Sequence, residues 1–168
     1  RRSLAAEDIR CKASSADLVT AVDRRVEEFI SAEIRGRYPG HGLFGEETGS
    51  SGDTAEHCWI IDPIDGTTSF VHGFPYYSVS IALRHRGRMV AGAVYAPMLR
   101  ELFTAEAGAG ARLNGRPIRV SECGELRNAL LATGFGCVRA RMRPDNFEFL
   151  PEITRSVRDI RRCGSAAL

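Results

Sequence analysis

The stretch that decides the fold of this chain is Trp59-Ile60-Ile61-Asp62-Pro63-Ile64-Asp65-Gly66-Thr67-Thr68. Its apolar start predicts a buried strand, which Pro63 should end because proline has no N–H for a strand ladder. Asp62 and Asp65 are then expected on a tight turn. Gly66 lets the backbone approach a ligand, and Thr67 is expected to begin a helix.

Hard carboxylate oxygens suit Mg²⁺, and the N–H groups at the start of a helix suit phosphate. The stretch therefore predicts a metal-dependent phosphate site at the exit of a strand. Asp, Gly and Thr are also ordinary residues of a strand-to-helix turn that binds nothing. Taken alone, the stretch leaves both interpretations open.

Three further motifs accompany it: Asp17-Leu18-Val19-Thr20-Ala21-Val22-Asp23, Gly45-Glu46-Glu47 and Arg162-Cys163-Gly164-Ser165-Ala166-Ala167-Leu168. In this order the four motifs resemble the inositol monophosphatase family of Mg²⁺-dependent, lithium-sensitive phosphatases, and the resemblance covers nearly the whole chain. It implies an α/β (α+β) fold, the layered helix–sheet sandwich shared with fructose-1,6-bisphosphatase.

Bulk properties agree with an ordinary globular protein. A length of 168 residues is enough for a single domain over 1–168. The net charge of +2 gives no argument for a nucleic-acid or membrane partner. The five cysteines are scattered, which favours reduced thiols and a cytoplasmic protein. Compared with the family, both ends look cut, so we expect a fragment, or a shortened gene product, that lacks the C-terminal part of the fold.

Local patterns predict the remaining elements. Apolar spacing from Leu18 onward predicts a helix that ends near Pro39, with Ser14, Ser15 or Asp17 as its N-cap. A short strand is expected to end at Glu46-Glu47. An antiparallel block should follow, with its later strands joined at a hairpin turn. Other expected strands lie at 9–11, 76–85, 88–96, 99–105, 111–113, 129–135 and 159–162. A helix is expected at 145–157, and 164–168 is expected to be the beginning of another.

The resemblance implies a metal centre. Glu46 and Asp62 would hold one Mg²⁺ together with the backbone carbonyl of Ile64, and Asp62 would bridge to a second ion that also takes Asp65. Glu46 would take part in catalysis by reaching a third ion through water. The residues support this independently, because carboxylates clustered this closely repel one another unless a cation lies between them.

The resemblance also implies the catalytic and substrate contacts. Thr67, hydrogen-bonded to Asp23, would position the water that attacks phosphorus. The N–H groups of Gly66 and Thr67 would hold the phosphate, and Asp65 and Ala166 would contact the rest of the substrate. Without the motif, Asp23 would be interpreted as a solvated aspartate on a helix face.

The function expected is hydrolysis of a small phosphate monoester, inositol monophosphate first and histidinol phosphate as the alternative. A further aspartate of the second metal site belongs to a W-D-x-A-A motif that the family carries beyond the G-S-A-A segment, so the isolated chain is expected to be weakly active or inactive. A non-catalytic binding protein is the alternative from another class. The family resemblance implies a homodimer for the full-length protein.

Overall fold

The computed structural model describes residues 9–11, 18–52, 55–136 and 142–168. Its centre is an eight-stranded sheet with the strand order β10-β9-β8-β7-β6-β5-β3-β4. All neighbours in this sheet pair antiparallel except β3 and β5, which run parallel. The strands are β3 (Gly42–Gly45), β4 (Gly49–Ser51), β5 (His57–Asp65), β6 (Ser78–His85), β7 (Arg88–Ala96), β8 (Glu101–Glu106), β9 (Gly110–Leu113) and β10 (Arg116–Ile118).

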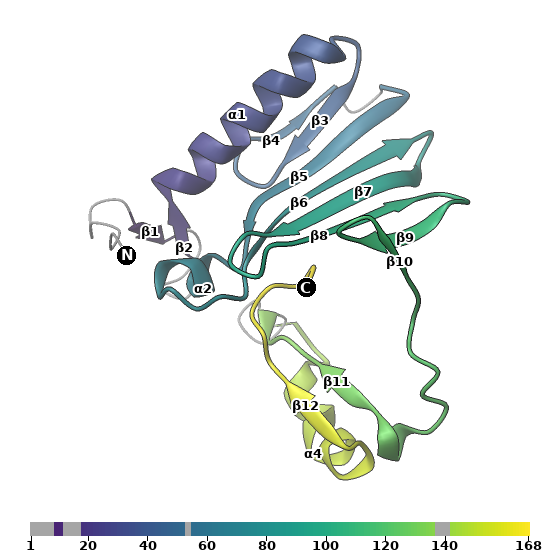
Figure 1. Ribbon diagram of the computed structural model, residues 1–168. Helices are drawn as coiled ribbons and strands as arrows, with labels where there is room; N and C mark the ends of the chain where they lie inside the picture. The colour runs from purple at the N-terminus through teal and green to yellow at the C-terminus, as the bar shows by residue number, and fades with distance from the viewer. Residues whose placement is uncertain (1–8, 12–17, 53–54, 137–141) are drawn as a thin grey trace.

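Helix α1 (Ala21–Arg37) lies over β3 and β5 in Figure 1. Ile34 of α1, Leu43 of β3 and Ile61 of β5 form the buried core between helix and sheet, and Trp59 packs against them. Full burial of such side chains stabilises a fold by ~1.5–3 kcal/mol each. The layered helix-on-sheet arrangement of the α+β type is therefore confirmed.

Helix α1 begins later than its apolar spacing predicts. Residues Leu18–Thr20 form strand β2, which pairs antiparallel with β1 (Ile9–Cys11). The N-cap is Thr20, whose hydroxyl accepts hydrogen bonds from the N–H groups of Val22 and Asp23. The candidate caps at 14, 15 and 17 lie outside the described residues.

A second group of elements follows the sheet and lies below it in Figure 1. Strands β11 (Leu130–Ala132) and β12 (Asp159–Arg161) pair parallel, after a short 3₁₀ turn, η2 (Leu126–Asn128). Helix α4 (Asn146–Ser156) lies between them in the sequence. From β12 the chain returns toward the sheet (Figure 1), where Ser165 contacts Asp65 of β5 and Ser78 of β6.

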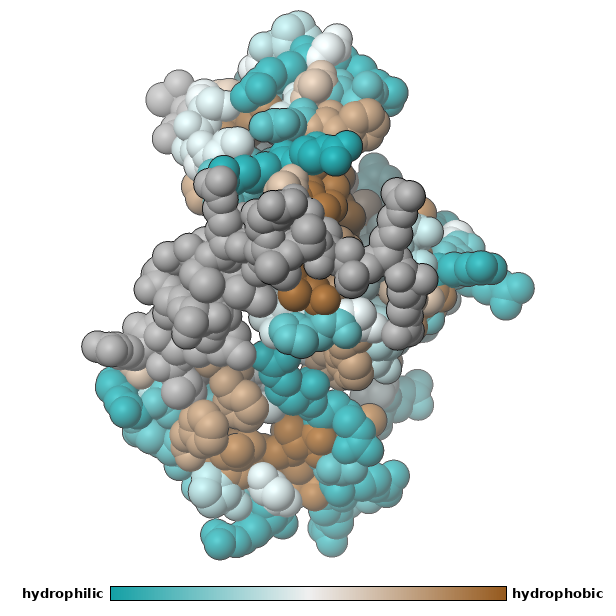
Figure 2. Space-filling model, turned by 90° about the vertical axis from the view of Figure 1, so that its left-hand side faces the viewer, coloured by the Kyte–Doolittle hydropathy of each residue, from teal (hydrophilic) through white to brown (hydrophobic). Residues whose placement is uncertain are grey.

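Apolar side chains remain exposed on α4, where Phe147, Phe149 and Ile153 face solvent. Figure 2 shows brown apolar atoms in the lower part of the molecule, the level at which α4 lies in Figure 1. Among the helices that the structure describes, none combines the length and the apolar character that crossing a membrane requires.

Candidate active site at the exit of strand β5

The site is built at the end of β5, where the strand continues further than its proline suggests. The prediction that Pro63 ends the strand is wrong, since β5 runs on to Asp65. The register against β6 shifts between Asp62, which pairs with Ser80, and Asp65, which pairs with Ser78. Proline is tolerated at such an irregularity because the ladder needs no N–H there, and the irregularity directs Asp62 and Asp65 to the same end of the sheet.

Gly66 makes the turn from β5 into helix α2 (Thr67–Val71), so the predicted helix start at Thr67 is confirmed. Its φ of 94° lies in the left-handed region that favours glycine. A Cβ there would also approach the carbonyl oxygen of Tyr76 to 3.1 Å and the nitrogen of Ser165 to 3.4 Å. Gly66 therefore lets three chain segments meet at one point.

Asp62 lies at the electrostatic centre of the site. Burial, the neighbouring Glu46 and, to a smaller extent, Asp65 raise its pKa from an ordinary 3.8 to about 8. The carboxyl groups of Asp62 and Glu46 are within hydrogen-bonding reach of each other. Asp62 Oδ1 is buried and has no hydrogen-bond partner among the residues that the structure describes. In the metal-free protein a proton therefore compensates for negative charge that the site concentrates.

Glu46 reaches Asp62 because the backbone of Glu46 is hydrogen-bonded to β5. Strand β3 ends at Gly45, two residues before the predicted end, and Glu46 follows it directly. The Glu46 N–H donates to the carbonyl oxygen of Ile61 at 3.1 Å. The loop after it contains strand β4, which the glycine-rich sequence did not predict.

Thr67 and Asp23 are brought together from segments 44 residues apart. The Thr67 hydroxyl lies 3.3 Å from Asp23 Oδ1 and 3.1 Å from the carbonyl oxygen of Ile64. Asp23 Oδ2 accepts hydrogen bonds from the N–H and the hydroxyl of Thr20 at 2.8 and 2.5 Å. Asp23 is only 1% exposed, so its interpretation as a solvated helix-face residue is wrong. Burial and the two donors on Oδ2 fix the carboxylate so that Asp23 Oδ1 faces Thr67.

Asp65 is held by the C-terminal segment. Ser165 Oγ donates to Asp65 Oδ2 at 2.5 Å, and the N–H groups of Ala166 and Ala167 donate to its two oxygens at 2.9 and 2.6 Å. Residues 164–168 form no helix in this structure, contrary to the prediction, and their N–H groups bind the Asp65 carboxylate instead. Ala166 therefore contacts Asp65 through its backbone.

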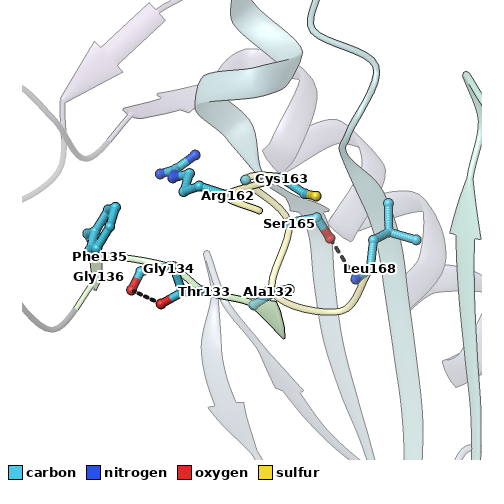
Figure 3. Close-up of a pocket in the computed structure, with 11 residues that line it drawn as sticks. Ala132, Thr133, Gly134, Phe135, Gly136, Arg162, Cys163, Ser165 and Leu168 are labelled. Carbon is cyan, nitrogen blue, oxygen red and sulfur yellow. Dashed lines mark hydrogen bonds between the residues drawn. The ribbon is translucent and has the colours of Figure 1, made fainter. Parts of the chain in front are cut away.

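A cavity of about 420 Å³ opens beside this segment. It lies between 132–136, after β11, and 162–168, after β12, as Figure 3 shows. Arg162, Ser165 and Leu168 are among the lining residues, and Ser165 Oγ accepts a hydrogen bond from the Leu168 N–H at 3.1 Å. The volume is in the range of small-molecule sites, and Ser165 connects the cavity to Asp65.

The donor set fits a hard divalent cation. The oxygens of Glu46, Asp62 and the Ile64 carbonyl belong to the class that Mg²⁺ prefers, and the unpartnered, buried Asp62 Oδ1 is an acceptor that a cation would satisfy. Across the described ranges, no three acidic, histidine or cysteine side chains already stand in a cation-binding arrangement. Carbonyl, water and substrate oxygens would therefore have to complete a coordination shell around Glu46 and Asp62.

Three residues of the site were not identified from the sequence: Thr20, Glu27 and Ser165. Glu27 is fully buried and accepts hydrogen bonds from the segment after Glu46. Its spacing from Asp23, four residues along one helix face, was the available signal. Ser165 stands inside a recognised motif, but its partner lies 100 residues away in the sequence. Asp17, part of the first motif, lies outside the described residues.

Comparisons with known proteins identify the family of this chain. The model of the inositol monophosphatase family matches residues 1–168. A Nus factor SuhB from Vibrio cholerae is 46% identical over 155 residues, which are 92% of this chain and 58% of the relative. Inositol monophosphatase 3 from Solanum lycopersicum is also 46% identical, over 90% of this chain and 59% of its own length. The chain thus spans somewhat less than three fifths of these relatives.

Solved structures show the same fold. The extragenic suppressor protein suhB from Bartonella henselae superposes with a TM-score of 0.85 at 38% identity, covering 96% of this chain and 62% of that one. An IMPase/NADP phosphatase complexed with Mg²⁺ and phosphate has a TM-score of 0.81 at 26% identity, covering 94% and 58%. A staphylococcal inositol monophosphatase-1 soaked in LiCl, described as an inhibitory complex, has a TM-score of 0.83 at 25% identity, covering 95% and 58%.

The family match along the whole chain, the identity to these relatives and the site at the end of β5 lead to one conclusion. This chain belongs to the inositol monophosphatase family.

Proposed function

We propose that the protein of which this chain forms the described part is a Mg²⁺-dependent phosphomonoesterase whose first candidate substrate is inositol monophosphate. The observation that carries the proposal is Asp62, a half-buried carboxyl group beside Glu46 and Asp65 with a pKa raised to about 8. Such an acidic cluster costs stability unless it serves a cation. It lies on the same turn as a threonine held by a buried aspartate.

Glu46, Asp62, Asp65 and the Ile64 carbonyl are the groups that would hold Mg²⁺. When bound, the cation would neutralise charge on the carboxylates and on the phosphoryl oxygens and would lower the pKa of a water molecule toward neutrality. The relative solved with Mg²⁺ and phosphate supports this assignment. Lithium inhibition of this protein is proposed on the same ground, from the relative soaked in LiCl.

Thr67 and Asp23 orient the water molecule that attacks phosphorus. The Thr67 hydroxyl has one O–H, which donates a hydrogen bond to Asp23 Oδ1 or to the Ile64 carbonyl oxygen. Its lone pairs then accept a hydrogen bond from a water molecule and fix that molecule's orientation. Asp23 keeps this direction because Thr20 occupies its other oxygen. Positioning of this kind contributes to rate by presenting the nucleophile in line with the bond that breaks.

The turn into α2 supplies the phosphate contacts. The first N–H groups of a helix have no acceptor within the helix, and Gly66 and Thr67 stand at this position. We assign them to the phosphoryl oxygens, and we assign Asp65 and Ala166 to the hydroxyl-bearing part of the substrate. The cavity of about 420 Å³ beside Ser165 is large enough for a small polyol or for the imidazole of histidinol phosphate.

A non-catalytic role is the second candidate. Relatives at 44–46% identity are named Nus factor SuhB, a designation that does not describe hydrolysis. The intact Asp23–Thr67 contact and the raised pKa of the Asp62 carboxyl group favour hydrolysis, because neither contributes to binding a macromolecule. A homodimeric, cytoplasmic protein is part of the proposal, from the family resemblance and the scattered cysteines.

The test is phosphate release from inositol 1-phosphate and from histidinol phosphate, with and without Mg²⁺. The chain is assayed alone and as part of a longer protein that has the full length of its relatives. Asp65→Asn serves as the inactive control in both forms. Mg²⁺-dependent release from either substrate that Asp65→Asn abolishes supports the proposal. In the longer protein, Mg²⁺ binding without release from any monoester, or no Mg²⁺ binding at all, refutes it.

A further inference from the structure

Helix α1 carries a second buried acid, Glu27, that the proposed chemistry does not use. Glu27 is 0% exposed and lies one helical turn after Asp23. Its Oε2 accepts a hydrogen bond from the Glu47 N–H at 2.8 Å. Its Oε1 accepts from the N–H and the hydroxyl of Thr48 at 2.9 and 2.5 Å. A buried carboxylate with three donors forms strong, charge-assisted hydrogen bonds.

These contacts immobilise the backbone on which Glu46 stands. Three consecutive N–H groups are engaged: Glu46 donates to Ile61 at 3.1 Å, and the next two donate to Glu27. The peptide planes on the C-terminal side of Glu46 therefore cannot rotate without breaking a hydrogen bond to α1. Because the direction of a side chain follows from its backbone, Glu27 restricts where the Glu46 carboxylate points.

Gly45 makes this approach possible. A Cβ at position 45 would overlap the Glu27 carboxyl group and would come within 2.8 Å of Thr48 Oγ1. The φ of Gly45 lies outside the left-handed region, so the space beside its Cα, and not its backbone conformation, is what a larger residue would take away. The local sequence therefore leaves room for a carboxylate that arrives from α1, 18 residues upstream.

We propose that Glu27 is a positioning residue for the metal site: it holds residues 46–48 so that the Glu46 carboxylate faces Asp62. The inference rests on the proposed function, because it names Mg²⁺ as the ligand whose binding depends on this arrangement. Helix α1 then orders both halves of the site, with Asp23 directing Thr67 and Glu27 directing Glu46. Outer residues that orient metal ligands typically change affinity by ~10–100-fold when they are replaced.

The test compares wild type with Glu27→Gln, and with Glu28→Gln as a matched control, since Glu28 is the exposed neighbour on the same helix. The side-chain amide in the Glu27→Gln variant presents an N–H₂ group to at least one backbone N–H, so one hydrogen bond is lost and two donors face each other. In the metal-free protein, hydrogen exchange of the Glu47 and Thr48 amides should accelerate at least ~10-fold in Glu27→Gln, while exchange at Ile61 stays unchanged. Mg²⁺ affinity measured by calorimetry should fall by ~10-fold or more, and high Mg²⁺ should restore phosphate release.

The outcomes separate this inference from the proposed function. Equal Mg²⁺ affinity in wild type and in folded Glu27→Gln overturns the inference alone, whatever happens to exchange, because Glu27 would then be only structural. A wild-type protein of the relatives' full length that binds Mg²⁺ but releases no phosphate refutes the proposed function, and the affinity comparison still decides the role of Glu27. A wild-type protein without Mg²⁺ binding overturns both. If Glu27→Gln does not fold, Thr48→Val, which removes only the hydroxyl donor, should still weaken Mg²⁺ binding, and an unchanged affinity there counts against the proposal.

Discussion

Replacing Asp62 with asparagine tests the electrostatics of the site without metal or substrate. In the folded protein the pKa of Asp62 is about 8, so the carboxyl group keeps its proton until the pH approaches that value. In the unfolded chain the pKa is the ordinary 3.8, and the proton is released near that pH. Because the pKa is raised in the folded state, the contribution of Asp62 to the free energy of unfolding is fully present below about pH 4 and is lost as the pH rises through about 8. Asparagine carries no titratable proton, so this decline should disappear in the variant.

The size of the effect follows from the pKa difference. Each pKa unit corresponds to ~1.4 kcal/mol, so the difference between 3.8 and about 8 would correspond to ~5–6 kcal/mol for a fully desolvated group. Asp62 is half-buried, and solvent screening reduces the expected loss to ~2–3 kcal/mol. Excess Mg²⁺ should return most of this stability at pH 8, because the cation takes the place of the proton.

The assay is urea unfolding in the presence of a chelator at several pH values between 5 and 8. Wild type should lose stability across this range, and Asp62→Asn should remain nearly flat and be the more stable protein at pH 8. Asp159→Asn is the control, because the exposed Asp159 has a pKa lowered by Arg161 and does not titrate in this range. Parallel curves for wild type and Asp62→Asn would show that the carboxyl groups at β5 are not coupled as described.

Three further substitutions address the remaining parts of the site. Thr67→Val should lower Mg²⁺-dependent phosphate release at least ~10²-fold while Thr67→Ser retains most of it, because only the hydroxyl orients water; equal rates for both variants in a phosphate-release assay would contradict this role. Gly45→Ala should destabilise the fold by ~1–3 kcal/mol, since its methyl group overlaps the Glu27 carboxylate, and a thermal unfolding midpoint within error of wild type would argue against that contact. Ser165→Ala removes a 2.5 Å hydrogen bond to Asp65 and should cost ~1–3 kcal/mol, measured by urea unfolding, and an unchanged midpoint would show that the N–H groups of the segment hold Asp65 without it.

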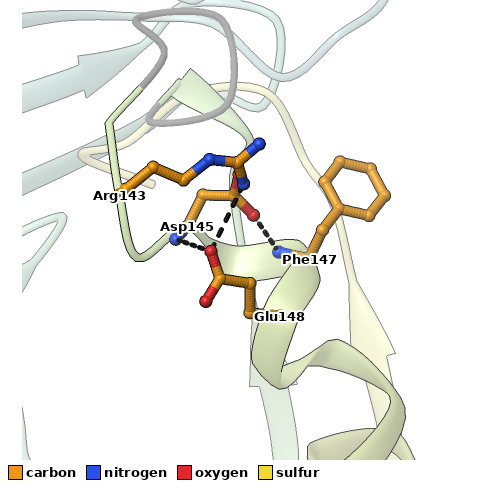
Figure 4. Close-up of polar contacts among 4 residues, drawn as sticks. All are labelled: Arg143, Asp145, Phe147 and Glu148. Carbon is orange, nitrogen blue, oxygen red and sulfur yellow. Dashed lines mark hydrogen bonds and ion pairs between the residues drawn. The ribbon is translucent and has the colours of Figure 1, made fainter.

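Elements with strong local signals could be predicted from the sequence. The turn at Asn114-Gly115 joins β9 to β10, and both residues have the positive φ that this turn type requires. Helix α4 begins where Asp145 and Glu148 form a capping box, which Arg143 reinforces by pairing with both carboxylates (Figure 4). Phe147 donates its N–H to Asp145 at 2.9 Å in the same cap.

The errors arise where a distant segment overrides a local preference. Pro63 ends a strand by local rules, but the irregular pairing with β6 carries β5 past it. Residues 164–168 have a helical composition, yet the Asp65 carboxylate binds the N–H groups that would begin the helix. The family motifs identified the acids of the site, and the structure brings Asp23 and Thr67 into contact. The four-residue spacing from Asp23 places Glu27 on the same helix face, but that spacing alone does not distinguish a buried glutamate from an exposed one.

The hydrogen bonds between Asp65 and Ser165 also determine when the site can form. They close a loop of 100 residues, and such a closure carries a large entropic cost until the segments on either side have folded. A chain emerging from the ribosome presents β5 and α1 long before it presents Ser165, since domains form from the N-terminal end during synthesis. Throughout that interval the carboxylate of Asp65 has to be satisfied by water. The acidic centre thus matures after the sheet, and a nascent chain has a finished sheet before it has a finished site.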